Sequence, residues 1–573
     1  AQAPPPAAYT QTARTGALTV TAYRGDGKTL LAFNLDRAAT AGLAGFTIQC
    51  EPAGVAPYYL HNMLRFATPT AHAQDDREAP GASINAPIHK FRWMHVPGTV
   101  HQGTTPVVGP YTYTVTPRYF EGAALTPLDP ARSARVTIDV GPLAVGALGV
   151  GFTRGFVQSQ AFVNHFGRTA KITPPGGPLA ADTTAIAGTD ASGHPSTFAE
   201  QHAWLGAGAR ARVLGLLDEV LADRALTLDV AAYDLDDPYV IRALLALAGQ
   251  GRVRVILDDA ELHHRPDAPT DEDRFAAAFT AAATGAAAVV RGHFARYAHA
   301  KVMIVSRGGV ARTVLTGSTN FSITGLYVNA NHVLVIDDRA VAAAYADMFQ
   351  LAWASRCDAS AFAAAPIAGA PTVFTGAGLP RTAIAFSPHR PAVAHAVLAD
   401  MAARIAAEAT APRGNVLFAV MQLDRGSGPV IPALAALHAD PRVWSYGISD
   451  SPGGIQLYDR RNKAGVLVSG RPTATQLPPP FNQVPTIRAH QVHHKFVVCG
   501  FGGADPVVYC GSSNLAELGE QENGDNLLAI RDPAVVAAFT IEALALVDHF
   551  DFLDRMSARA PATAGAAPDR KST

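Results

Sequence analysis

One segment of the chain occurs twice at a fixed spacing, and this repetition limits the possible folds more than any other feature. The first copy reads HAKVMIVSRGGVARTVLTGSTN from His299 to Asn320, and the second reads HHKFVVCGFGGADPVVYCGSSN from His493 to Asn514. Subtracting 299 from 493 gives a shift of 194 residues, and no insertion interrupts this shift within the segment. A repeat of this length indicates two copies of one supersecondary unit.

The polar residues of the two copies recur at the same offsets. The recurring pairs are His299 with His493, Lys301 with Lys495, Ser318 with Ser512, and Asn320 with Asn514. A purely structural duplication explains recurring apolar positions, but it gives no reason for these four polar types to recur together. We therefore interpret the repeat as a duplicated chemical motif.

Strand and helix patterns alternate around both copies. A buried-strand pattern at Thr227–Leu235 is followed by a helix pattern and then by a strand pattern at Arg252–Asp259, and the second copy repeats this order up to Arg442–Asp450. The sequence therefore predicts two α/β halves, at residues 146–370 and 371–557.

The N-terminal part of the chain has a different pattern. Short runs between residues 17 and 140 alternate apolar and polar side chains and are separated by Gly, Pro and Asp. This pattern is typical of an antiparallel β-sandwich of immunoglobulin or fibronectin type. We expect an accessory domain at residues 1–145 without catalytic residues, and a disordered tail at residues 558–573.

Composition limits the partners and the compartment. The 46 Lys and Arg residues balance 47 Asp and Glu, so a net charge of −1 provides no global basic field for nucleic acid. The longest apolar stretch, Val140–Phe152, is interrupted by glycines and too short to span a membrane. The start AQAPPPAAYT lacks Met, which fits a mature protein after signal-peptide removal, although an artificial start would look the same. We expect a secreted or periplasmic protein.

The duplicated motif resembles the signature of the phospholipase D superfamily, in which His-x-Lys followed by Gly-Ser-x-Asn is present twice. The resemblance covers roughly residues 150–557. It implies two α/β halves related by a pseudo-twofold axis, one active site between them, no required metal, and phosphodiester cleavage in two steps through a phosphohistidine. Most of the family has an Asp seven residues after the His, whereas Ser306 and Gly500 stand there in this chain. The tyrosyl-DNA phosphodiesterase branch also dispenses with that Asp.

The residue types suit this chemistry. One imidazole can attack phosphorus while the other protonates the leaving alkoxide, and the Lys and Asn side chains can hold the nonbridging oxygens. Ser318 and Ser512 are expected either to bind phosphate or to hold the local turn. His and Lys two residues apart on a strand face the same side, and a hairpin of equal length would place Lys495 opposite Asn514.

The same hairpin pairing would place Cys499 opposite Cys510, at a separation that permits a disulfide. The alternative is two buried free thiols.

The residue 32 positions after each histidine differs between the copies, being Asn331 after His299 and Asp525 after His493. In the family this position orients the imidazole. A carboxylate favours the protonated ring, whereas an amide orients the ring without adding charge. We therefore expect His299, paired with Asn331, to attack phosphorus, and His493, paired with Asp525, to protonate the leaving group.

Other polar clusters are given structural interpretations. On a strand His493 and His494 point to opposite faces, so HQVHHK does not predict a metal site. His263 and His264 lie in the polar stretch HHRPDAPTDED, which indicates a solvated surface. The Pro-rich stretch 471–486 is expected to be a spacer loop, or alternatively a lid that exposes Phe481.

The sequence as a whole favours a secreted, monomeric phosphodiesterase that needs neither metal nor cofactor. Its expected substrate is a phospholipid at a membrane or micelle surface, whose head group is hydrolysed or transferred. The alternatives are a nuclease or nucleotide phosphodiesterase of the same superfamily, and a noncatalytic phosphate- or surface-binding protein.

Overall fold

The computed structural model describes residues 8–62, 66, 75–155, 159–423, 426–451, 454–458, 466–468 and 491–557. The chain divides into an N-terminal unit that ends at Pro142 and a C-terminal unit, Leu143–Ala558. The boundary falls slightly before the expected residue 145, because β10 (Leu143–Val145) pairs with β11 (Leu148–Phe152) in a sheet of the C-terminal unit. The proposed lid at 471–486 and the tail at 558–573 lie outside the described residues.

The N-terminal unit contains two antiparallel sheets, of order β1-β2-β3-β6 and β5-β4-β7-β8, with β9 paired to β7. Its elements are β1 Thr10–Thr15, β2 Leu18–Arg24, β3 Thr29–Leu35, η1 Arg37–Thr40, β4 Leu43–Pro52, β5 Tyr58–Tyr59, β6 Arg92–His95, β7 Gly109–Glu121, β8 Ala124–Leu125, η3 Pro130–Arg132 and β9 Ala134–Val140. Both sheets contribute to one hydrophobic core, in which Val20 and Phe33 cluster with Ile48, Tyr113 and Ile138. Alternate residues of β9 are buried, as expected for strands with one face on a core.

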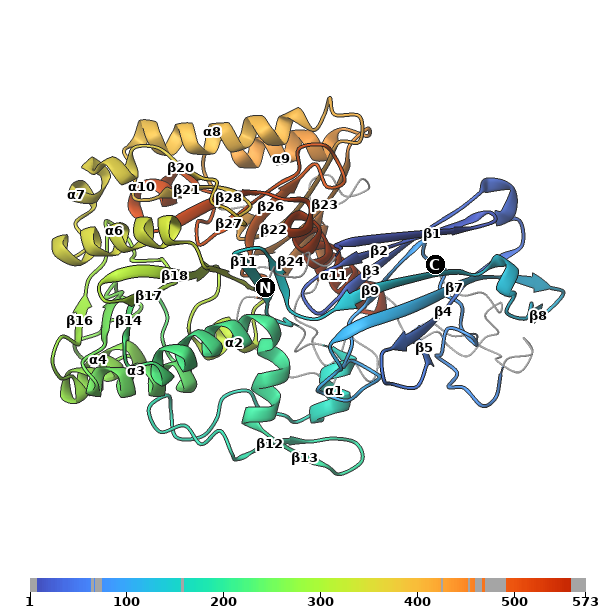
Figure 1. The fold of residues 1–573 in the computed structure, drawn as a ribbon, viewed down its shortest axis with the longest axis horizontal. Helices are drawn as coiled ribbons and strands as arrows, with labels where there is room; N and C mark the ends of the chain where they lie inside the picture. The colour runs from blue at the N-terminus through green and yellow to red at the C-terminus, as the bar shows by residue number, and fades with distance from the viewer. Residues whose placement is uncertain are drawn as a thin grey trace. The chain divides into compact units, whose positions relative to one another are not determined.

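The first sheet of the C-terminal unit has the order β10-β11-β19-β18-β17-β14-β15-β16. Its remaining strands are β14 Leu226–Ala232, β15 Val253–Leu257, β16 Ala288–Arg291, β17 Val302–Arg307, β18 Val310–Gly317 and β19 His332–Ile336. Beside it lie the hairpin β12 Ile186–Thr189 and β13 Pro195–Thr197, and the helices α1 Gln160–Phe166, α2 Phe198–Ala222, α3 Pro238–Gly249, α4 Asp271–Ala282, α5 Ile323–Tyr327, α6 Arg339–Ser355 and α7 Ala359–Ala364. Helices α2, α3 and α4 lie on the opposite side of this sheet from α6 (Figure 1).

The second sheet of the C-terminal unit has the order β20-β21-β28-β27-β26-β22-β23-β24-β25. Its strands are β20 Thr372–Phe374, β21 Arg381–Phe386, β22 Asn415–Met421, β23 Trp444–Ser451, β24 Gly454–Tyr458, β25 Val466–Val468, β26 Lys495–Cys499, β27 Val507–Gly511 and β28 Asn526–Arg531. The helical elements around it are η4 Pro366–Ala368, α8 Pro391–Ala407, α9 Val430–Ala439, α10 Glu517–Glu522 and α11 Pro533–Ser557. The fold of this unit is thus mixed α/β.

Local signals in the sequence explain where the helices begin. Asp237 accepts the backbone N–H groups of Tyr239 and Val240 at the start of α3, where Pro238 occupies the first turn. Asp338 accepts two N–H groups at the start of α6 in the same way. Each carboxylate satisfies donors that have no partner within the helix, and its charge is favourable at the helix N-terminus.

Helix α6 beside the first sheet and helix α11 beside the second sheet each also contact the other sheet. The ring of Tyr345 in α6 lies 4.8 Å from that of Phe386 in β21, and the ring of Phe539 in α11 lies 5.1 Å from that of Phe152 in β11. Strands β18 and β27 are in contact as well. These contacts hold the two motif hairpins next to each other.

Helix α11 includes a segment, Pro533–Phe552, that is long and apolar enough to span a membrane by length and composition. The sequence analysis did not identify this segment. In the structure 78% of its most apolar window is buried, and α11 packs against strands β22, β23 and β26. Its apolar composition is therefore explained by its place in the protein core.

Candidate active site

The two motif hairpins have the same register. Met303 in β17 pairs with Leu315 in β18, and Val497 in β26 pairs with Tyr509 in β27. Both members of the second pair lie 194 residues after those of the first. The repeat in the sequence therefore appears as a repeat in strand pairing. Each His-x-Lys segment lies at or directly before the start of the first strand of its hairpin, β17 or β26.

The expected pairing within the second hairpin is wrong by three residues. Cys499 pairs with Val507 rather than Cys510, because the turn after Cys499 closes through Gly500 and Gly502, both with positive φ. Lys495 consequently does not face Asn514, which follows the end of β27. The disulfide prediction is also wrong, since Cys499 and Cys510 are buried free thiols, and the thiol alternative is confirmed.

The catalytic histidine candidates take their partners from the opposite sheet. His299 Nδ1 lies 2.7 Å from Asp525 Oδ1, and His493 Nδ1 lies 2.9 Å from Asn331 Oδ1. The expected pairing of His299 with Asn331 and of His493 with Asp525 is therefore wrong. All four side chains are buried, so these contacts are shielded from water.

Backbone hydrogen bonds between the sheets explain this crossing. Gly524 N–H donates to the Tyr297 carbonyl at 2.9 Å, next to Asp525 and close to His299. In the equivalent place Ala330 N–H donates to the Gln491 carbonyl at 2.7 Å, and His493 N–H donates back to the Ala330 carbonyl. The segment that carries each orienting residue is thus fixed to the histidine segment of the other sheet.

The orientation of the His493 ring follows from the hydrogen bonds around Asn331. Asn331 Nδ2 donates to the Gly325 carbonyl at 2.9 Å, so Oδ1 is the amide atom that faces His493. Ser318 Oγ donates to the same Oδ1 at 2.7 Å. His493 Nδ1 must therefore carry a proton, and chemistry at phosphorus is left to Nε2.

The two motif serines are buried and bonded to neighbouring strands. Ser318 holds Asn331 and accepts the His332 N–H at 3.1 Å, while Ser512 Oγ accepts the Asn526 N–H at 3.0 Å. The sequence analysis expected Ser318 and Ser512 either to bind phosphate or to hold the local turn. The observed contacts are of the second kind.

The two motif lysines are fully buried. Lys301 donates to the His299 carbonyl, and Lys495 donates to the His493 carbonyl at 2.7 Å. Among the described residues, neither ammonium group lies within ion-pair distance of a carboxylate. Burial lowers the pKa of Lys301 to about 8, and burial together with the nearby charge of Lys301 lowers the pKa of Lys495 well below its usual value. A bound anion would stabilise both charges.

The motif asparagines differ in their surroundings. The Asn320 side-chain amide is buried and donates to Asp234 Oδ2. The Asn514 side chain is partly buried after β27. Neither amide oxygen accepts a hydrogen bond within the part of the chain that the structure describes.

Three residues that the sequence analysis did not single out support the site. Asp258 Oδ1 accepts the N–H of Ala298, the residue before His299, at 2.6 Å. Asp450 Oδ2 accepts the N–H of Val492, the residue before His493, at 3.3 Å. The ring of Tyr233 lies 4.7 Å from the ring of His299 and 4.8 Å from the Lys301 ammonium. Asp258 and Asp450 both occur at the ends of similar strand patterns in the sequence. This shared position could have identified them as candidate site residues.

A groove of about 580 Å³ lies elsewhere in the second sheet. It is bounded by α8 and by residues of β21 and β28, including Ala383, Leu527 and Ala529. None of the motif residues lines it. This groove is therefore separate from the candidate site, which consists of the motif side chains and the residues that contact them.

Residues 222–353 match a family described as "Cardiolipin synthase, PLD-like domain". They include His299, Lys301 and Asn320. This part of the chain is similar to phospholipase D-like domains. The expected resemblance to the phospholipase D superfamily is therefore confirmed.

A curated relative, the mitochondrial cardiolipin hydrolase of Xenopus tropicalis, is 31% identical over 131 residues. The match covers 22% of this chain and 54% of the relative, so the chain spans about half the length of that protein.

Similar solved structures include the phosphatidylserine synthase of Haemophilus influenzae, at 11% identity and a TM-score of 0.38, covering 61% of this chain and 84% of that one. The yeast tyrosyl-DNA phosphodiesterase is similar at 10% identity and a TM-score of 0.31, covering 56% and 85%. These similarities are too low to support an argument about function.

Proposed function

We propose that the protein is a phosphodiesterase of phospholipase D type that works without a metal ion, through a phosphohistidine. The observation that carries the proposal is a pair of buried lysines with lowered pKa values beside two histidines whose Nδ1 atoms are fixed. A phosphodiester would supply the anion that the lysines lack, and the histidines would supply a nucleophile and an acid. We further infer that the two sheets are duplicated halves and that the N-terminal unit is an accessory β-sandwich.

In the first step Nε2 of His299 attacks phosphorus and forms a P–N bond while the P–O bond to the leaving group breaks. His493 gives its Nε2 proton to the departing oxygen. In the second step His493 takes a proton from water or an alcohol, whose oxygen attacks phosphorus and breaks the P–N bond. Lys301 and Lys495 hold the nonbridging oxygens throughout.

Because His299 pairs with Asp525 and His493 with Asn331, the assignment of attack to His299 needs a different reason from the one drawn from the sequence. Burial lowers the pKa of His299, against the opposing effect of Asp525, so the ring is neutral and its Nε2 lone pair can attack. The ring becomes positive once phosphorylated, and Asp525 at 2.7 Å then compensates that charge, as the carboxylate of a Ser-His-Asp triad does for its imidazolium. The amide of Asn331 provides no such compensation for His493.

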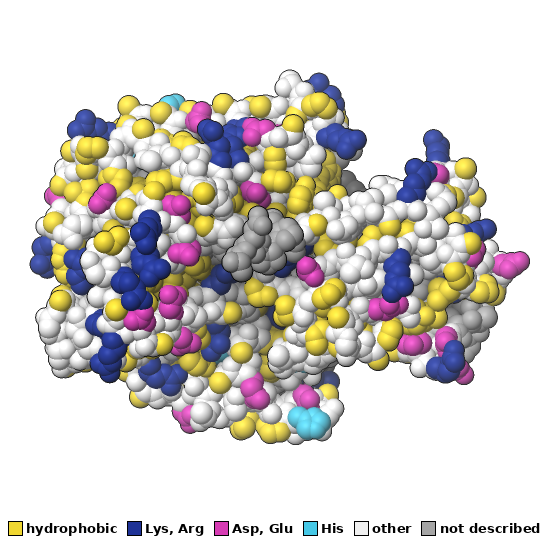
Figure 2. Space-filling model, viewed as in Figure 1, with side chains coloured by type: hydrophobic (Ala, Val, Ile, Leu, Met, Phe, Trp, Pro, Cys, Tyr) yellow, Lys and Arg dark blue, Asp and Glu magenta, His cyan; other side chains and the backbone are white. Residues whose placement is uncertain are grey.

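A phospholipid is the favoured substrate class. The matched family and the curated relative are both named for cardiolipin, a phospholipid. Basic and acidic side chains are interspersed over the visible face, without a continuous basic track (Figure 2). A nucleic-acid substrate is therefore the second candidate. We also propose that the protein is secreted or periplasmic and acts as a monomer.

The test is to incubate the purified protein, after EDTA treatment, separately with phosphatidylcholine vesicles, cardiolipin vesicles and a single-stranded oligonucleotide. Release of a head group or of a phosphatidyl product from either lipid is the expected result. Cleavage of the oligonucleotide alone would favour the nuclease. Cleavage of none, with retained binding of inorganic phosphate, would favour a noncatalytic phosphate-binding protein.

A further inference from the structure

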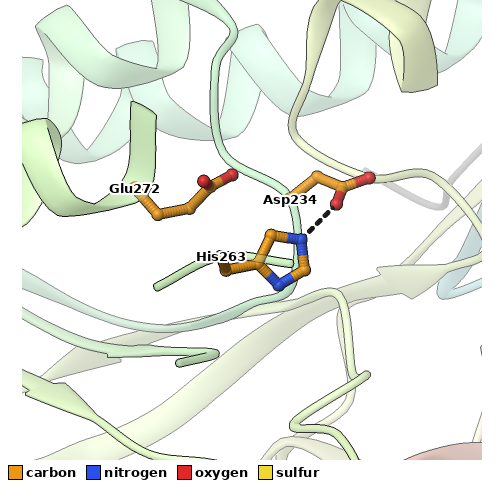
Figure 3. Close-up of side chains that lie close together, drawn as sticks. All are labelled: Asp234, His263 and Glu272. Atoms are coloured by element: carbon orange, nitrogen blue, oxygen red, sulfur yellow. Dashed lines mark hydrogen bonds and ion pairs between the residues drawn. The ribbon is translucent and has the colours of Figure 1, made fainter. Parts of the chain in front are cut away.

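His263 lies in the turn between β15 and α4 and is buried, so the expectation of a solvated surface is wrong for this residue. Its Nδ1 lies 2.8 Å from Asp258 Oδ2, and its Nε2 lies 2.7 Å from Asp234 Oδ1. Figure 3 shows its ring beside Asp234 and near Glu272. The neighbouring His264 is half-exposed and contacts Asp273.

The two carboxylates determine the protonation of the His263 ring. A neutral imidazole has one donor and one acceptor nitrogen, but both nitrogens here face acceptors, so the charged ring with two N–H groups satisfies the site. Burial opposes this charge, yet the hydrogen bonds with Asp234 and Asp258, supported by the charge of Glu272, raise the pKa of His263 to about 9. The rings of Tyr233 and His263 also pack at nearly right angles, and Arg291 donates to the His263 backbone carbonyl.

A metal ion is the competing explanation for this cluster. The ligand atoms of Asp234, His263 and Glu272 lie within 4.8 Å of one another, a spacing that an ion could bridge. However, 2.7 Å between Nε2 and Asp234 Oδ1 is a hydrogen-bond distance. A metal would also require Nε2 to lose its proton, since only the lone pair of an imidazole nitrogen binds metal. The imidazolium therefore supplies the cation that the carboxylates need.

Three contacts connect this cluster to the candidate active site. Asp258 accepts the N–H of the residue before His299 at 2.6 Å. The second oxygen of Asp234 accepts a hydrogen bond from the Asn320 amide. The Tyr233 ring contacts the His263 ring at 4.3 Å and the His299 ring at 4.7 Å.

We propose that His263 is a positioning residue, a buried imidazolium that fixes His299 through Asp258 and Asn320 through Asp234. Its catalytic consequence rests on the proposed function. The imidazolium also offsets part of the negative charge of the two carboxylates that act on Lys301, which reduces their repulsion of a phosphate at the site. Without it, Asp234 and Asp258 would lose the cation that both contact.

The first measurement uses the wild-type protein and does not depend on turnover. In protein labelled with ¹⁵N-histidine, His263 should show two ring N–H groups at pH 7, assigned by their loss in His263→Gln. Added Ca²⁺ or Zn²⁺ should leave both signals in place. A single N–H group, or loss of the Nε2 proton when metal is added, would overturn the proposal.

The second measurement compares His263→Gln with the matched control His264→Gln. We expect kcat to fall about 10- to 100-fold in His263→Gln, the range known for loss of an outer-shell partner at metal sites, and to stay within about twofold in the control. The affinity for inorganic phosphate should fall as well, which remains measurable if no phosphodiester is turned over. Unchanged kcat and phosphate affinity in folded His263→Gln would refute the positioning role.

A third variant covers the case in which His263→Gln does not fold. Asp234→Asn keeps the size of the side chain but removes the charge that links His263 to Asn320. We expect a comparable fall in kcat and in phosphate affinity. Wild-type values for both in Asp234→Asn would show that the cluster does not act through Asn320.

Discussion

Replacing Asp525 by Asn tests whether a negative charge beside His299 stabilises the phosphorylated ring. The Asp525 oxygen lies 2.7 Å from His299 Nδ1, and both side chains are almost fully buried. Two unit charges about 4 Å apart at an effective dielectric constant of ~20 interact by about 4 kcal/mol. If this stabilisation is fully developed in the transition state, its loss slows phosphorylation by about 10³-fold, at about 1.36 kcal/mol per factor of ten.

The assay is a single-turnover experiment that quenches the reaction and measures phosphate bound to histidine over time. Asp525→Asn should form the phosphohistidine about 10³-fold more slowly than wild type. The matched control is Asn331→Asp, which adds a carboxylate beside His493 and should not slow attack by His299 to that extent. Formation of the intermediate by Asp525→Asn at a rate within about fivefold of the wild-type rate would refute the argument. It would show that Asp525 does not stabilise the positive charge that the His299 ring gains when the P–N bond forms.

Three further predictions concern the histidines, a lysine and the cysteines. With an activated leaving group, His493→Ala should accumulate label on His299, and label on His493 in His299→Ala instead would reverse the two roles. Because the pKa of Lys301 is lowered to about 8, its ammonium is lost as pH rises through that value, so kcat/KM should fall on the alkaline side. Lys301→Arg should move this fall to higher pH, and an unmoved profile would assign it to another group. Alkylation of the unfolded protein without reductant should modify both Cys499 and Cys510, as mass spectrometry would show; a mass lacking two labels would indicate a bridge.

The repeat in the sequence was sufficient to predict that the two motif hairpins, β17 with β18 and β26 with β27, correspond to each other. It could not predict that Asn331 serves His493, because a fixed offset along the chain does not say which sheet a side chain faces. That information lies in the backbone bond between Ala330 and Gln491. The register error at Cys499 had a local cause, since an equal-length hairpin was assumed where two glycines close a tighter turn.

His263 shows a different limit of sequence reasoning. Its surroundings in the chain are polar, which is typical of a solvated loop. The two carboxylates that enclose the ring come from the ends of β14 and β15, so the site exists only after the parallel strands have formed. Asp234 and Asp258 were visible at these strand ends, but nothing in their spacing indicated that they share one histidine.

The crossed partners make each reactive histidine a composite of both sheets. Two copies of the first sheet alone would give two His–Asn pairs, and two copies of the second would give two His–Asp pairs. A symmetric dimer of either kind would contain identical histidines, with no built-in distinction between attacking and proton-donating rings. A single chain that contains both sheets carries Asn at 331 and Asp at 525, so its two histidines have different partners.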